Sequence, residues 1–283
     1  MESKSLLRVA VLMTCYNRVE KTLSCLNHFY NAAVPENIVF DIYLVDDNSP
    51  DQTGKIVKDK YPNINVTFGT GSLYWNRGMR LAWKKARQQR DYDFYLWLND
   101  DTYIKPNAIE AIFYDYFFLV NNKIHAVVSG VCQDLDSDKI TYGGLDDKYH
   151  LLAPNGSPQS CKYINGNFTL VSKEIFHKLS YLSFKYSHAA GDHDYSLRAR
   201  KNGFQCYITS SALAVCSRGE SNTEQDWHNP NISLRNRIQN LFSIKGGNFV
   251  DYTLYSFVNF GLLKTVKIIF WRFRKVLFPF KEK

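Results

Sequence analysis

Apolar and polar positions follow two different periods along the first half of the chain. Short runs in which almost every residue is apolar, such as VAVLM and FYLWL, are typical of strands buried on both faces of a parallel sheet. The stretches between them place apolar residues three and four positions apart, which predicts amphipathic helices. Strands that alternate with helices indicate an α/β domain with a mainly parallel central sheet flanked by helices. We expect strands at residues 8–13, 39–45, 64–68, 94–98 and 125–131, and helices at 18–31, 53–60, 76–89 and 107–121.

The second half of the chain is less regular. Residues 135–158 are rich in Asp, Gly and Tyr, a composition that predicts hairpins or a mobile loop. A helix is expected at residues 192–201, and Gly203 provides its C-terminal stop. The other expected elements are strands at 167–171, 205–208 and 212–216 and a short helix at 173–179.

The end of the chain has a third pattern, LLKTVKIIFWRFRKVLF. Residues 262–283 hold seven Lys or Arg and one Glu, so they carry most of the net charge of +8. A basic amphipathic helix of this kind can lie in an anionic membrane interface, whereas a nucleic-acid binder spreads its basic residues over the folded domain. The alternative is a terminal helix docked on the core. At 100° per residue, one face holds Leu262, Val266, Ile269, Phe270, Phe273 and Leu277, and the other holds Lys264, Lys267, Arg274 and Lys275.

The six cysteines and the chain start bear on the cellular compartment. The cysteines are scattered, form no C-x-x-C pair and fall mostly in apolar runs, which predicts reduced thiols in a cytosolic protein. The first apolar run is interrupted by Arg8 and followed by CYNR, so it suits a first strand better than a signal peptide. No stretch reaches the roughly 18 apolar residues that a spanning helix needs.

Three acidic clusters follow expected strands or precede an expected helix. Asn99-Asp100-Asp101 comes directly after FYLWL, and hard divalent cations take one or two carboxylates together with substrate phosphates. Asp46-Asp47 ends the expected strand FDIYLV, where a carboxylate could accept hydrogen bonds from a base or a ribose. Asp192 and Asp194 stand at the start of a helix. The alternatives are a solvated turn for the first cluster and capping of helices for the other two.

The order of these segments resembles a known family. VAVLMTCYNR, LVDDNSPDQT, GSLYWNRGMRLAW, WLNDDT, NGNFTLVSKEIF and GDHDYSLRARKNGF are similar to family-2 inverting glycosyltransferases, in particular the bacterial rhamnosyltransferase-like enzymes of surface-polysaccharide assembly. The resemblance covers roughly residues 7–217. It implies a GT-A fold, a nucleotide-diphospho-sugar donor and a Mg²⁺ or Mn²⁺ ion. Two positions depart from the pattern, because Gly191 stands where many relatives have Glu and Asn99 where they have Asp.

The resemblance also implies roles for individual residues. Asp192 matches the catalytic base, and Asp101, aided by Asp100, matches the metal ligand. His228 is a candidate further metal ligand, with an ordinary surface histidine as the alternative. The remaining candidates are Thr14, Asn17 and Asp47 in the nucleotide pocket, Arg77 and Arg80 at the diphosphate or ribose (or on a solvated helix face), and Asn165 and Gly166 near the donor sugar and acceptor.

These observations predict an inverting glycosyltransferase with a saccharide or lipid-linked saccharide acceptor, cytoplasmic and peripheral at the inner face of the membrane. Residues 1–220 would form the catalytic domain, with a nucleotide-binding half at 7–131 and an acceptor half at 132–220. Residues 221–283 would form a helical extension that ends in the basic tail. Two alternatives stay open, a nucleotidyltransferase of related fold and a non-catalytic nucleotide- or sugar-binding module. The lack of glycines in CYNRVEK argues against the first, and the combination of NDD with Asp192 argues against the second.

Overall fold

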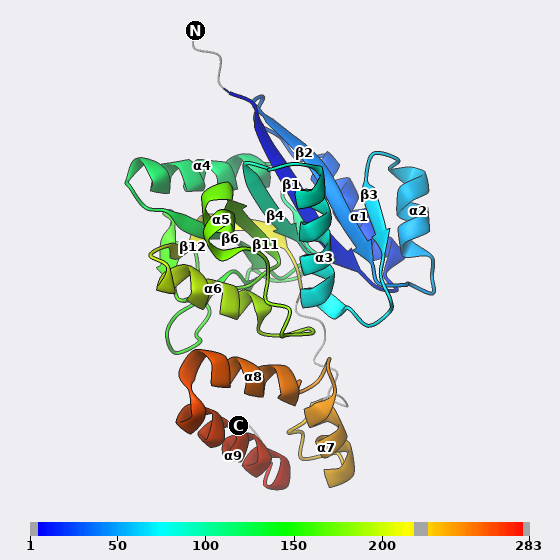
Figure 1. Ribbon diagram of the computed structural model, residues 1–283, viewed down its shortest axis with the longest axis vertical. Helices are drawn as coiled ribbons and strands as arrows, with labels where there is room; N and C mark the ends of the chain where they lie inside the picture. Colours follow the sequence, from blue (N-terminus) through cyan, green and yellow to red (C-terminus); the bar gives the residue numbers. More distant parts are fainter. Residues whose placement is uncertain (1–4, 218–225, 280–283) are drawn as a thin grey trace.

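The computed structural model describes residues 5–217 and 226–279 and is organised around one large sheet (Figure 1). The strand order is β3-β2-β1-β4-β11-β6-β12-β5, with β7 beside β6 and β9 beside β12. Strands β1, β2, β3, β4, β6 and β12 run in one direction and β11 runs against its neighbours β4 and β6. The expected α/β class with a mainly parallel sheet is therefore confirmed. The strands are β1 (Leu7–Cys15), β2 (Ile38–Asp46), β3 (Asn65–Phe68), β4 (Phe94–Leu98), β5 (Tyr103–Ile104), β6 (Ala126–Gln133), β7 (Ile140–Tyr142), β9 (Gln159–Cys161), β11 (Phe168–Ser172) and β12 (Gln205–Val215), and β8 (Gly144–Leu145) pairs with β10 (Tyr163–Ile164).

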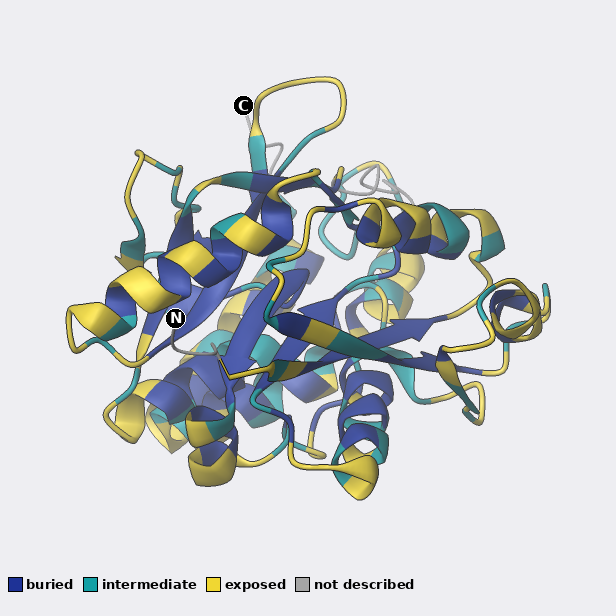
Figure 2. Ribbon diagram, turned by 90° about the horizontal axis from the view of Figure 1, so that it is seen from above, coloured by how far each residue is buried: buried dark blue, intermediate teal, exposed yellow. Residues whose placement is uncertain are grey.

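Helices cover both faces of this sheet, which explains why its strands are apolar at almost every position. In β1, Val9 and Val11 join the core under α1 and α4, whereas Ala10 and Leu12 join the core under α3, α5 and α6. Figure 2 shows buried strands in the centre and helices whose outer faces are exposed. The helices are α1 (Val19–Tyr30), α2 (Thr53–Lys60), α3 (Tyr74–Gln89), α4 (Ala108–Asn121), α5 (Lys173–Leu179) and α6 (Gly191–Lys201).

Three further helices, α7 (Leu234–Phe242), α8 (Phe249–Phe260) and α9 (Leu262–Leu277), form a group of their own, which lies below α6 in the view of Figure 1. Helix α8 packs against α6, where Tyr255 joins a small core with Tyr163 and Tyr186. Helix α9 packs on α7 and α8 and buries Thr265, Arg272 and Val276. Over residues 5–217 and 226–279, no helix is both long enough and apolar enough to span a bilayer.

The structure departs from the expected elements at residues 205–216. One strand, β12, runs through this segment instead of two, and its register with β6 shifts between Ile208 and Ala212. The shift has a local cause, because the Ser210 N–H donates to the Asp115 carboxylate (2.7 Å) of α4 and the Thr209 hydroxyl accepts the Val131 N–H (3.0 Å). At the register shift, side-chain oxygens thus accept backbone N–H groups that would otherwise pair between β6 and β12, which is typical of a β-bulge.

Candidate functional site

Asp46 and Asp47, at the end of β2, are both buried and both bound to backbone N–H groups. Asp46 accepts hydrogen bonds from the N–H groups of Ser49 (2.9 Å) and Gly54 (2.7 Å), the latter in the first turn of α2. Asp47 is 4% exposed and accepts from the N–H groups of Gly71 (2.8 Å), Leu73 (2.8 Å) and Tyr74 (3.0 Å) at the start of α3. Both carboxylates therefore cap helices, the alternative considered from the sequence. A contact of Asp47 with a nucleotide base stays a prediction.

Thr14 and Asn17 lie where β1 ends, beside the loop that follows β2. The Thr14 hydroxyl donates to the Val45 carbonyl (3.2 Å) and lies against Gly78, where any Cβ would overlap it. Asn17 is exposed with a left-handed φ of 54°, and its N–H donates to the Ser49 hydroxyl (2.9 Å). The loops after β1 and β2 thus meet at one edge of the sheet, as the carboxyl ends of parallel strands do.

The acidic pair after β4 lies at the same edge and holds a cation supplied by the chain. The Arg18 guanidinium, from the loop after β1, bridges Asp100 (3.1 Å) and Asp101 (2.8 Å). Asp100 also accepts from the Thr22 hydroxyl (3.3 Å). Burial raises the pKa of Asp100 to about 7, and the Arg18 charge acts in the opposite direction. The Asp101 side chain is 29% exposed, so it is the carboxylate that a ligand can reach.

Asn99 connects this pair to two other parts of the site. Its side-chain oxygen accepts from the Trp75 indole N–H (2.6 Å) of α3, and its N–H donates to the Asn167 carbonyl (2.9 Å). The neighbouring Gly166 packs against the Trp75 ring so closely that any Cβ would overlap the ring. Asn99 thus joins α3, through its side-chain oxygen, to the loop before β11, through its backbone N–H.

Asp192 completes the connection from the first turn of α6. Its carboxylate accepts from the N–H groups of Gly166 (3.1 Å) and His193 (2.8 Å). The positive end of the α6 dipole favours a negative charge there. The neighbouring Asp194 has a different environment, because it is buried and bound to Arg198 (2.8 Å) and the Tyr186 hydroxyl (3.1 Å). Of the two acids, Asp194 is structural and Asp192 is the partly exposed one.

The three acidic clusters are therefore joined at one edge of the sheet. The connection runs from Asp47 to the start of α3, through Trp75 to Asn99 beside Asp100 and Asp101, and through residues 166–167 to Asp192. The neighbouring Asn165 is itself anchored, because its side-chain oxygen accepts a hydrogen bond from the Gly143 N–H (3.2 Å).

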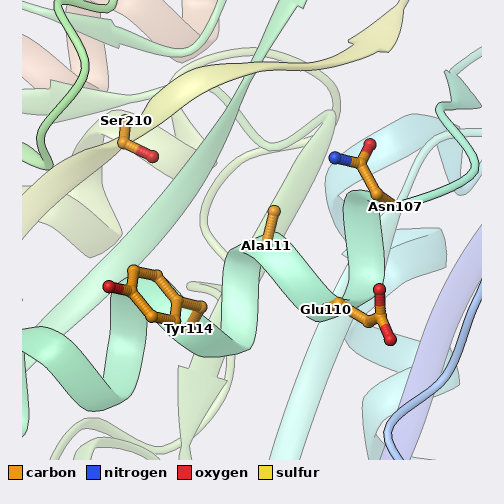
Figure 3. A pocket seen from close by; sticks show the side chains of 5 residues that line it. All are labelled: Asn107, Glu110, Ala111, Tyr114 and Ser210. Atoms are coloured by element: carbon orange, nitrogen blue, oxygen red, sulfur yellow. The ribbon is translucent and has the colours of Figure 1, made fainter.

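Three candidates lie apart from this connection. Arg77 and Arg80 are on the solvent-facing side of α3, in a hollow of about 430 Å³ with Leu73, Leu81, Lys84 and Phe184. The Arg80 guanidinium donates to the Leu182 carbonyl (2.5 Å). His228 pairs with Asp226 instead of with the acids after β4. Roles for these residues at the diphosphate or metal stay predictions. A second hollow, of about 350 Å³, lies on α4 and includes none of the candidate residues; it is lined by Asn107, Glu110, Ala111, Tyr114 and Ser210 (Figure 3).

A divalent cation fits the acids after β4 if substrate phosphates supply the other ligands. Among the described residues, no three His, Cys, Asp or Glu side chains cluster as a metal site. One or two carboxylates are nonetheless the usual protein share where Mg²⁺ binds with phosphates, and Mn²⁺ also prefers oxygen ligands. Asp100 and Asp101 already attract a cation, the Arg18 guanidinium.

Sequence reasoning missed two residues of this region. Arg18 has a weak sequence signal, since it is a basic residue just after the first strand and the NDD acids stand at the end of a neighbouring strand. Asp251, in α8, contacts the loop before Asp192 and carries no sequence signal, because it lies in the extension outside every recognisable motif.

The fold and the joined acidic clusters define a GT-A glycosyltransferase architecture. The chain belongs to glycosyl transferase family 2, whose model matches residues 10–179. A poly-beta-1,6-N-acetyl-D-glucosamine synthase of Staphylococcus epidermidis is 29% identical over 119 residues, which is 42% of this chain and 27% of that protein. A hyaluronan synthase of Streptococcus pyogenes is 30% identical over 110 residues, 37% of this chain and 26% of that protein. The chain thus spans about a quarter of the length of these relatives.

Solved structures share the fold at low sequence identity. TarS 1-349 of S. aureus in complex with UDP-GlcNAc has a TM-score of 0.56 at 16% identity, covering 95% of this chain and 82% of that one. The mannosyltransferase PcManGT of Pyrobaculum calidifontis, in complex with GDP-Man and Mn2+, has a TM-score of 0.57 at 15% identity, covering 97% and 71%. GalNAc-T7 with UDP, GalNAc and Mn2+ has a TM-score of 0.59 at 12% identity, covering 76% and 44%.

Proposed function

We propose that this protein transfers a sugar, with inversion, from a nucleotide-diphospho-sugar to a saccharide or lipid-linked saccharide during bacterial surface-polysaccharide synthesis. The observation that carries the proposal is the Gly166-Asn167 segment, which contacts Asp192 on one side and Asn99, next to the acidic pair, on the other. An acid able to accept a proton and acids able to hold a cation are thereby brought to the same loop. The relatives, synthases of two polysaccharides, support the same class of reaction.

Asp192 is the proposed general base. Two N–H groups orient its carboxylate and leave lone pairs free to accept the proton of an acceptor hydroxyl. As that proton leaves, the hydroxyl oxygen attacks the anomeric carbon from the face opposite the nucleotide. The bond from the anomeric carbon to the phosphate oxygen breaks, and its electron pair stays on the diphosphate. Inversion follows from a single displacement.

Residues that follow β1 and β4 are placed to stabilise the negative charge that develops on the diphosphate. Asp101, with Asp100 behind it, would hold Mg²⁺ or Mn²⁺, and the bound ion would supply a Lewis acid for the leaving group. Arg18 is a second positive charge at the same place. Its Nη1 atom contacts both carboxylates, and other N–H groups of the guanidinium can pair with a phosphate oxygen.

The test is hydrolysis of a donor panel, UDP-N-acetylglucosamine, GDP-mannose and dTDP-rhamnose, with Mn²⁺ present. A transferase releases nucleoside diphosphate slowly from its own donor even without acceptor. Turnover of dTDP-rhamnose above the others would support the rhamnosyltransferase-like subgroup. Asp192→Asn should lower the turnover number about 10²- to 10⁴-fold, the usual range for general-base catalysis, and leave donor binding intact. Near-full activity of that variant would remove Asp192 from the mechanism.

We also propose that α9 binds the cytoplasmic face of an anionic membrane. Its predicted apolar face is exposed, with Leu262 at 64%, Phe270 at 72% and Leu277 at 51%. The residues that α9 buries, Thr265, Arg272 and Val276, belong to neither predicted face, and the Arg272 guanidinium lies over the Tyr252 ring of α8 (4.6 Å). This arrangement favours interfacial binding over a tail whose apolar face packs on the core. Residues 1–220 and 221–283 would then be the catalytic domain and its membrane-binding extension.

A further inference from the structure

A carboxylate of the C-terminal helices binds the loop that leads to Asp192. Asp251 lies in the first turn of α8 and is 4% exposed. Its Oδ2 atom accepts hydrogen bonds from three consecutive N–H groups, those of residues 187–189, at 2.9, 2.9 and 3.3 Å. The same oxygen accepts from the Ser187 hydroxyl (2.9 Å) and the Asn248 amide (2.9 Å). Successive N–H groups that converge on one charged oxygen determine the backbone conformation of the segment that carries them.

Residues 187–189, whose N–H groups bind Asp251, lead directly into the first turn of α6. Ala189, the last of the three donors, is three positions before Asp192. Ala190 follows with a left-handed φ of 65°, a conformation that a residue with a side chain rarely adopts without support. Gly191 then packs against the Asn76 side chain of α3, where any Cβ would overlap Asn76 Oδ1.

The same loop is held from its other side by α3. The Asn76 amide donates to the carbonyls of Ser183 and Tyr186, both at 2.8 Å. The loop therefore lies between two buried polar side chains, one from the sheet domain and one from the C-terminal helices. Only the second, Asp251, carries a charge.

We propose that Asp251 is a positioning residue, which holds residues 187–189 so that Asp192 faces the acceptor hydroxyl. The inference rests on the proposed function, in which Asp192 is the base. It gives the C-terminal helices a part in catalysis in addition to membrane binding.

The expected effect falls on the chemical step. Without the charge of Asp251, the loop relaxes and the Asp192 carboxylate shifts relative to Gly166. Misplacement of a catalytic group by about 1 Å can lower a rate by about 10²-fold. The nucleotide is expected at the ends of β1 and β2, which Asp251 does not contact, so the donor KM should change little.

The experiment compares Asp251→Asn with a matched variant, Asp115→Asn, in the full-length protein. Asp115 is also buried, at 1% exposed, and also accepts from a serine N–H (2.7 Å) and the hydroxyl of the same serine (3.0 Å). That serine, Ser210, belongs to β12, and the contact joins α4 to the sheet and not to the loop before Asp192. Each variant therefore removes one buried charge that accepts from both the N–H and the hydroxyl of a serine.

Two quantities are measured in both variants. Hydrogen exchange of peptides covering residues 183–192 should become about tenfold faster or more in Asp251→Asn, because three N–H groups lose a charged acceptor, and should be unchanged in Asp115→Asn. Hydrolysis of the nucleotide sugar that the wild type turns over fastest should show a turnover number lowered about 10- to 100-fold in Asp251→Asn, with a donor KM within about twofold of wild type.

The outcomes separate this inference from the proposed function. Absence of hydrolysis by the wild type, with every donor of the panel, contradicts the proposed function, while exchange still reports whether Asp251 holds the loop. Unchanged exchange in Asp251→Asn overturns the inference whatever the activity. Faster exchange with an unchanged turnover number also overturns it, since the loop would then be held without effect on Asp192. Equal losses of turnover in both variants would mean that general destabilisation is the cause.

Discussion

Asp47 allows a sharp test, because the structure and the family resemblance give it different roles. Its two oxygens accept three N–H groups, Gly71 on Oδ1 and Leu73 and Tyr74 on Oδ2. Asp47→Asn keeps the shape of the side chain but leaves one acceptor oxygen. If that oxygen stays with Leu73 and Tyr74, the new NH₂ group faces the Gly71 N–H, and two donors oppose each other in a buried site.

The magnitude follows from these contacts. A hydrogen bond to a charged group contributes about 1.5–3 kcal/mol, and a negative charge at a helix N-terminus adds about 0.3–1 kcal/mol. We therefore expect the free energy of unfolding to fall by about 2–4 kcal/mol. With a urea m-value of about 3 kcal/mol/M, the unfolding midpoint should fall by about 1 M.

Urea unfolding followed by circular dichroism provides the measurement, with Asp59→Asn as the control. Asp59 lies exposed on α2, and exposed substitutions usually change stability by less than about 0.5 kcal/mol. A free energy of unfolding for Asp47→Asn that equals the control would refute the capping argument. If stability is unchanged while the affinity for UDP or GDP falls, Asp47 contacts the nucleotide, as the resemblance implies. A loss of stability with unchanged affinity assigns it to the fold.

Three further predictions concern the metal, the approach to Asp192 and the membrane. Asp101→Asn should abolish the Mn²⁺-dependent part of the thermal stabilisation by UDP or GDP, which for wild type at 100 times the dissociation constant is about 2.7 kcal/mol; an undiminished shift would argue against Asp101 as a ligand. Gly191→Ala should lower the free energy of unfolding by about 1–3 kcal/mol, measured in urea, because the added methyl overlaps Asn76, and a neutral result would contradict the close packing there. Replacing Lys264 and Lys267 together by Gln should weaken sedimentation with anionic vesicles about 30-fold, at about 1 kcal/mol for each charge near the surface, and binding that ignores vesicle charge would exclude this electrostatic contribution.

The order of strands and helices could be predicted from the sequence because apolar periodicity is a local property. The runs that end at Met13, Val45 and Leu98 lie within β1, β2 and β4, and the acids that follow β2 and β4 lie at one edge of the sheet. Parallel strands bring their carboxyl ends to the same edge, so strand direction alone predicts that proximity. The break expected between residues 208 and 212 was wrong, since Asp115 from a distant helix supports a bulge inside one strand.

The function of each acid depends on which donors come within reach, and that is a matter of tertiary structure. Apart from the family resemblance, the sequence shows Asp47, Asp101 and Asp192 only as carboxylates at the ends of strands or the start of a helix. In the folded chain, Asp47 faces three N–H groups of the turn before α3, and Asp101 faces Arg18. Asp192 depends on Gly166, which reaches it because β11 runs antiparallel between β4 and β6.

The sequence by itself determined the α/β class, the positions of the acidic clusters and the two-faced pattern of the tail, because each depends on residues close together in the chain. Tertiary structure alone decided that Arg18 bridges Asp100 and Asp101, and that Asp251 binds a loop more than sixty residues earlier. Hydrogen bonds act over about 3 Å, and only the folded chain brings such distant residues that close.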